Sequence, residues 1–100
     1  MTLNQVTEKF SNFKAFLDEH ITEASNEYLV KLKSLDTITF LGGIRANMSI
    51  ISCNTEEERI EIAYGNILEK TGFDVSGFTD DVVVKFKRYI EYFYKVSKCF

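Results

Sequence analysis

Apolar residues recur at helical spacing from residue 3 to residue 35, and this pattern limits the N-terminal part of the chain to helices. Thr2 or Asn4 is expected to cap the first helix, because a short polar side chain accepts a hydrogen bond from the first free backbone amides. Ser25 and Asn26 interrupt the pattern with side chains that compete for backbone hydrogen bonds. We therefore expect a break or kink near these two residues.

Two further helices are predicted near the middle and the end of the chain. The sequence has no proline, so helices must end at glycine or at small polar residues. One helix begins after Asn54 or Thr55, carries glutamates in its first turn and ends at Gly72. The other begins after Thr79, and its predicted buried face consists of Val83, Phe86, Ile90, Phe93 and Val96.

The segment from Thr37 to Cys53 has two interpretations. Read with period two, it forms a β-hairpin that turns at Gly42 and Gly43. Read with period 3.6, it forms a helix capped by Asp36, with a stripe of small residues beside its apolar face. Two glycines inside a helix cost about 2 kcal/mol relative to alanine. The helix is preferred, since a small stripe allows a neighbouring helix to approach closely.

The length of 100 residues, of which 45% are hydrophobic, fits a single domain with one modest core. We predict that residues 1–100 form a single helical domain, an all-α compact bundle of four to five helices. The alternative is an α+β fold in which a hairpin over residues 37–52 packs on helices. The short connection from Phe73 to Phe78 has apolar residues at both ends, and we expect it to pack onto the core.

The longest apolar runs are only a few residues, so no membrane-spanning helix is predicted. The N-terminus has neither the basic nor the apolar part of a secretory signal, and we expect a cytoplasmic protein. Cys53 and Cys99 are then expected to be reduced thiols. No cofactor is predicted.

The sequence contains few residues with the chemistry of catalysis or metal binding. His20 is the only histidine, and a zinc site of three or four ligands would need one or two more beside His20 and Glu23. Cys53 precedes a helix N-terminus, which favours a thiolate, but His20 is the only histidine that can act as its base. No phosphate-binding loop, nucleophile elbow or dinucleotide motif occurs. We therefore expect no enzyme and no metal site.

Charge is separated along the chain. Asn54 to Asp81 contains eight acidic residues against two basic ones, which gives −6. Val82 to Phe100 contains five basic residues against one acidic residue, which gives +4. A basic stripe with an aromatic residue at helical spacing is a candidate nucleic-acid surface. Its members are Lys85, Arg88, Tyr92 and Lys95.

The sequence has 14 aromatic residues, a rich supply for one small core. We expect that seven of them cannot all be buried in a chain of this length: Phe10, Phe13, Phe16, Phe40, Phe86, Tyr89 and Phe93. Surplus aromatic residues are typical of a homodimer or partner surface.

These observations predict a non-enzymatic protein-binding module, such as a phage or mobile-element regulator or inhibitor that occupies the surface of another protein. The candidate partner-binding residues are Glu57, Glu58, Glu61, Tyr92 and Tyr94. The alternative is a nucleic-acid-binding protein that uses Lys85, Arg88 and Lys95 on its last helix. A homodimer is compatible with either function.

Overall fold

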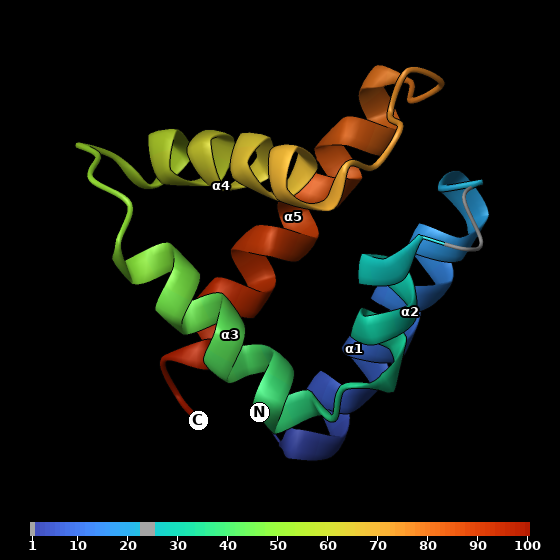
Figure 1. The fold of residues 1–100 in the computed structure, drawn as a ribbon. Helices are drawn as coiled ribbons and strands as arrows, with labels where there is room; N and C mark the ends of the chain where they lie inside the picture. Colours follow the sequence, from blue (N-terminus) through green and yellow to red (C-terminus); the bar gives the residue numbers. More distant parts are fainter. Residues whose placement is uncertain (1, 23–25) are drawn as a thin grey trace.

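The computed structural model describes residues 2–22 and 26–100, and over these residues the chain forms five α-helices and no strand (Figure 1). The all-α prediction is therefore confirmed. The helices are α1 (Leu3–His20), α2 (Glu27–Ser34), α3 (Thr37–Ser49), α4 (Glu56–Thr71) and α5 (Asp80–Ser97).

The helices are arranged as two pairs joined through α3 (Figure 1). α1 packs beside α2, and α4 packs across α5. α3 contacts α1, α4 and α5, and its contact with α5 is the most extensive in the molecule. The α1–α2 pair and the α4–α5 pair thus lie on different sides of the fold. α3 contacts both pairs, and α1 also meets α5 directly through aromatic rings.

Each helix begins at a polar cap, because the first backbone amides of a helix need acceptors outside it. Thr2 accepts from the Gln5 amide while the Gln5 side chain accepts from the Thr2 amide, a reciprocal capping box. The other caps are Asn26, Asp36, Thr55 and Thr79. The predicted caps Asp36 and Thr79 are confirmed. Of the two pairs of alternatives, Thr2 rather than Asn4 caps α1, and Thr55 rather than Asn54 caps α4.

The predicted break in the first apolar segment is present. α1 ends at His20, and Asn26 starts α2 by accepting from the Tyr28 and Leu29 amides. Ser25 lies outside the described residues.

The preferred helical interpretation of the segment after Asp36 is confirmed, because Thr37–Ser49 form α3, and the alternative hairpin over residues 37–52 is wrong. The Asp36 carboxylate accepts from both the amide and the hydroxyl of Thr39, which fixes the first turn of α3 and lowers the pKa of Asp36. Packing on α5 outweighs the propensity cost of two glycines. The small stripe does not form the contact, since Ala46 and Ser49 are exposed.

The prediction that seven aromatic residues cannot all be buried is also wrong. Each of them is at most 9% exposed: Phe10, Phe13, Phe16, Phe40, Phe86, Tyr89 and Phe93. They form one cluster between α1, α3 and α5, which we call the aromatic core. Phe10 stacks on Phe40 with ring centroids 4.1 Å apart, and Phe93 meets Phe40 edge-on at 4.9 Å. Rings from three helices fill the same space, so one small domain holds all of them.

The last connection packs as predicted. Gly72 ends α4 with φ +68°, a left-handed conformation that glycine adopts without strain. Phe73 is buried, and Val75 and Phe78 are half-buried against the core. On the buried face of α5, Val83 is only half-buried, while Phe86, Ile90, Phe93 and Val96 are buried as predicted.

Candidate functional site: an apolar groove between α2 and α4

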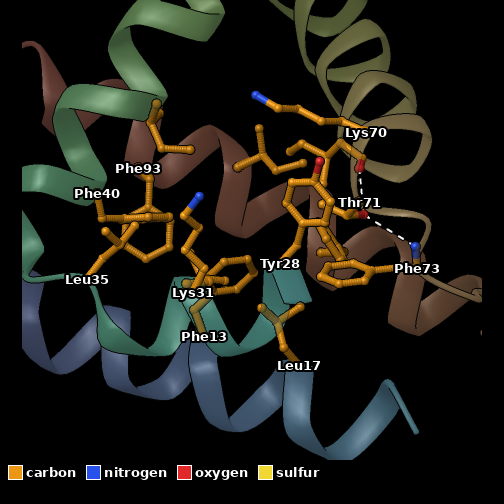
Figure 2. Close-up of a pocket in the computed structure, with 15 residues that line it drawn as sticks. Phe13, Leu17, Tyr28, Lys31, Leu35, Phe40, Lys70, Thr71, Phe73 and Phe93 are labelled. Carbon is orange, nitrogen blue, oxygen red and sulfur yellow. Dashed lines mark hydrogen bonds between the residues drawn. The ribbon is translucent and has the colours of Figure 1, made fainter. Parts of the chain in front are cut away.

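An open apolar cavity of about 230 Å³ lies where the α1–α2 pair faces the α4–α5 pair (Figure 2). α2 forms one wall through Tyr28, Lys31, Leu32 and Leu35. The end of α4 and the residues after it form the other wall: Ile67, Lys70, Thr71 and Phe73. The floor belongs to α1, α3 and α5: Phe13, Leu17, Phe40, Ile44, Phe86, Ile90 and Phe93.

The α2 wall is fixed to α1 by polar contacts behind it. Lys33 pairs with Asp18 of α1. The Lys14 ammonium lies 4.1 Å from the centroid of the Phe10 ring and donates to the carbonyls of Lys33 and Leu35. These carbonyls lie at the C-terminus of α2, where a cation is favourable. α2 is therefore held at its end although it has only eight residues.

One end of the cavity is closed by a hydrogen bond between the two walls. The Asn26 amide Nδ2 donates to the Thr71 carbonyl at 3.3 Å. Thr71 is itself held by its hydroxyl, which donates to the Ile67 carbonyl and accepts from the Phe73 amide (Figure 2). This bond ties the start of α2 to the end of α4.

A second cavity of about 130 Å³ continues along the seam of α3 and α4. It shares Ile44, Ile67, Lys70 and Ile90 with the first cavity. We call the two cavities together the α2–α4 groove. The far end carries Ile50, which is 81% exposed and is the most exposed large hydrophobic residue described.

The position of Ile50 is fixed by its neighbours. Met48 is 2% exposed and anchors the last turn of α3 in the core. Arg59 Nη1 donates to the carbonyls of Met48 and Ile51, at 2.7 and 3.2 Å, so the backbone on both sides of Ile50 is held by α4. The exposed isoleucine therefore belongs to an ordered turn rather than to a loose end.

Lys31 and Lys70 are the only charged residues that line the first cavity among the residues described. Both are exposed, and within residues 2–22 and 26–100 neither forms an ion pair or a side-chain hydrogen bond. Figure 2 shows both side chains extending over the apolar lining, Lys31 from α2 and Lys70 from α4. The groove thus combines an apolar interior with a cationic rim.

A scan against protein-family models, a search of curated proteins and a search of solved structures each return no match. In the described part of the chain, no helix has the length and apolar character needed to cross a membrane. Residues 2–22 and 26–100 contain no group of three or more histidine, cysteine, aspartate or glutamate residues placed to hold a metal ion.

The predicted acidic residues lie on the first two turns of α4, outside the groove. Glu57 and Glu58 are exposed, and the Glu58 carboxylate accepts from the Asn54 amide at 3.2 Å. Glu61 pairs with Lys87 of α5 at 2.7 Å. Two of the three carboxylates thus have local partners that stabilise the start of α4 and its contact with α5.

The two predicted tyrosine anchors do not share a surface with one another. Tyr92 is half-buried beside α1, with the Lys9 ammonium 5.2 Å from its ring centroid. Tyr94 is 8% exposed and lies between Arg59 of α4 and Lys98. Residues two apart on a helix point in different directions, so they reach different neighbours. The burial of Tyr94 removes it as an exposed anchor.

The predicted basic stripe is exposed at Lys85, Arg88 and Lys95. Lys85 and Arg88 line a shallow hollow on the α1–α5 face, and Lys9 of α1 lines it too. Lys95 is outside this hollow and pairs with Glu91 at 3.3 Å. Tyr89 lies in the floor of the hollow, and burial raises the pKa of its hydroxyl.

His20 and Cys53 are not brought together. The His20 ring packs against the rings of Phe16 and Phe78, with centroids 4.8 and 6.0 Å away. The loop that contains Cys53 and the end of α1 that contains His20 lie at opposite sides of the molecule (Figure 1). Glu23, the proposed partner of His20, lies outside the described residues.

Sequence reasoning missed the groove because its residues carry the same signal as a core. Leu32, Leu35, Ile44 and Ile67 lie on apolar helix faces, and all are half-buried. The sequence did contain one signal of the groove. Lys31 directly precedes Leu32, so a charged residue borders the apolar face of the short second helix.

Proposed function

We propose that this protein is a non-enzymatic protein-binding module that holds an apolar element of a partner protein in the α2–α4 groove. The observation that carries the proposal is the mostly apolar lining, which extends from Tyr28 to the exposed Ile50 and includes Asn47 and Asn66 in the second cavity. Apolar surface that is left open on a folded domain is favourable to cover, because each Å² removed from water contributes about 25 cal/mol.

This site replaces the one that the sequence suggested. Surplus aromatic residues give no support to a binding surface or a homodimer, because the aromatic core absorbs them. Binding through the groove is consistent with a regulator or inhibitor that acts by occupying another protein. The acidic residues Glu57, Glu58 and Glu61 then stabilise α4 rather than contact the partner.

The experiment compares two matched double variants in capture from the source lysate. Tyr28→Asp with Ile50→Asp places charge at both ends of the groove, on side chains that are 42% and 81% exposed. Ile38→Asp with Val84→Asp places the same charge on side chains that are 51% and 46% exposed and line neither cavity. All four positions are exposed, so both variants are expected to fold, which circular dichroism checks.

We expect a set of captured proteins that the groove variant loses and the control variant retains. Equal capture by the two variants, or capture of the same proteins by beads alone, contradicts the proposal. Loss in both variants with intact helicity points to non-specific apolar adhesion and contradicts it as well.

A second candidate function is binding of a nucleic-acid backbone at the α1–α5 hollow. It is favoured by one observation, the placement of Lys9 of α1 beside Lys85 and Arg88 of α5. Three cations from two helices attract phosphates better than a single stripe does. We expect retention of RNA or DNA in a gel shift at low salt, lost in Lys85→Glu with Arg88→Glu. No shift for the natural chain at low salt contradicts it.

A further inference from the structure

We infer that the partner element in the α2–α4 groove is an amphipathic helix with acidic flanks, because Lys31 and Lys70 stand on opposite walls above an apolar lining. This inference rests on the proposed function and adds the chemistry of the partner. Three features of the groove carry it: the scarcity of hydrogen-bonding groups, the paired cavities and the unpaired lysines.

The lining favours a helix over an extended segment. An extended peptide brings free backbone N–H and C=O groups, and each such group left unpaired against an apolar surface costs about 1–3 kcal/mol. The first cavity offers few acceptors for the N–H groups, chiefly the hydroxyls of Tyr28 and Thr71, and the Thr71 hydroxyl is already bonded to Ile67 and Phe73. The lysine ammonium groups on its rim can only donate. The second cavity adds two asparagine side chains, Asn47 and Asn66. A helix satisfies its own backbone and presents only side chains.

The shape of the groove favours an elongated occupant with separate apolar anchors. The two cavities, of about 230 and 130 Å³, follow one another along the helices. They meet at Ile44, Ile67, Lys70 and Ile90. Side chains one and two turns apart on a helix can enter the two cavities in succession, while Ile50 extends the contact at the far end.

The rim favours acidic flanks on that helix. No aspartate or glutamate lines either cavity among the described residues. Lys31 and Lys70 therefore lack a partner within the described chain, and Lys70 borders both cavities. A carboxylate on each side of an apolar face would meet one of these ammonium groups at the edge of a region that excludes water, where screening is weaker. Basic flanks would meet repulsion instead.

The test uses two synthetic helical peptides with leucines at i, i+3/i+4 and i+7 and identical sequences apart from the flanks. One carries glutamate at the flanking positions and its twin carries lysine. We expect the glutamate peptide to bind about tenfold more tightly, since two exposed pairs each contribute a modest attraction in one case and a repulsion in the other. Titration followed by backbone amide NMR shifts locates the contact, and the largest shifts are expected in α2 and the second half of α4.

A charge-reversed protein makes the test specific. Lys31→Glu with Lys70→Glu is expected to invert the preference between the two peptides. Lys85→Glu with Arg88→Glu changes the net charge equally at residues outside the groove, and it is expected to leave the preference unchanged. Equal affinity of the two peptides, or inversion by both double variants, overturns the acidic helix and leaves the groove as a binding site.

Three further outcomes are decisive. Shifts confined to the α1–α5 face place the peptide elsewhere and overturn the inference. Dodecanoate added as a probe of small anionic amphiphiles is expected to bind weakly or not at all; saturable binding in the groove while the glutamate peptide fails to bind overturns the inference in favour of a lipid-like ligand. Groove-dependent capture in the lysate experiment, with no peptide binding, rejects the acidic helix as the occupant but leaves the proposed function standing.

Discussion

The aromatic core and the α2–α4 groove share several of their residues but differ in packing. Phe13, Phe40, Phe86 and Phe93 form part of the core on one side and the floor of the groove on the other. On the core side, rings from three long helices meet at centroid distances such as 4.1 and 4.9 Å. On the groove side, the opposite walls leave about 230 Å³ open. Residue type is therefore not what separates core from site.

The separation comes from where each helix is held. α2 is tied to α1 by the Lys33–Asp18 pair and by Lys14, and its start is tied to α4 by Asn26. These contacts fix α2 at both of its ends. With only eight residues, α2 cannot extend far enough to cover the apolar faces of α3 and α4 as well. A short helix that is held at both ends thus leaves a groove beside a well-packed core.

The largest expected effect tests whether the core carries the stability. Phe93→Ala removes a ring that is 1% exposed and contacts four other rings of the core. We expect it to lower the free energy of unfolding by about 3–5 kcal/mol through lost burial and a new cavity. Leu32→Ala, in the half-buried groove wall, is expected to cost only about 1 kcal/mol. Urea unfolding measures the free energy of unfolding of both variants. Equal losses would contradict the difference in packing between the aromatic core and the groove.

An intermediate effect tests whether the groove has room that the core lacks. Val6→Phe enlarges a residue that is 0% exposed, and we expect it to destabilise the fold by about 1–3 kcal/mol. Ile67→Phe adds a smaller volume, and it adds it beside open space, because Ile67 borders both cavities. Its cost is expected to stay below about 1 kcal/mol. The same variant fills the groove and is expected to weaken binding of the glutamate peptide. A loss for Ile67→Phe as large as for Val6→Phe would show that the groove closes in solution.

The smallest expected effect concerns the cap of α3, the helix that joins core and groove. Hydrogen bonds from Thr39 lower the pKa of Asp36 below its ordinary value of 3.8. The stabilisation from its charged form is therefore present above that value and is lost as the pH falls through the lower folded pKa. Asp36→Asn keeps a capping oxygen but does not titrate.

The measurement for Asp36 is the difference in unfolding free energy between the natural chain and Asp36→Asn from neutral pH down to about pH 3. We expect this difference to shrink as the pH falls below about 4, where Asp36 begins to be protonated in the unfolded chain but is still charged in the folded one. A difference that stays constant with pH would show that the charge of Asp36 contributes nothing to the cap. Asp74 also has a lowered pKa and is unchanged in both proteins, so its contribution cancels.

The amino-acid sequence by itself determined the local structure. Short polar residues before apolar periodic segments predicted the helix starts at Asp36 and Thr79, because capping depends on neighbours within one turn. Gly72 predicted the end of α4 for the same local reason. Helical periodicity also identified which side of each helix faces inward, including Phe86, Ile90 and Phe93 on α5.

Only the tertiary structure decided which inward faces meet. Periodicity assigns Phe40 and Ile44 to the same apolar face of α3, yet Phe40 is 6% exposed in the core while Ile44 is half-buried in the groove. The difference depends on how closely a distant helix approaches each residue, which is set by contacts between segments far apart in the chain, such as Asn26 with Thr71. A one-dimensional pattern records the direction of a side chain but not the distance to the surface opposite it.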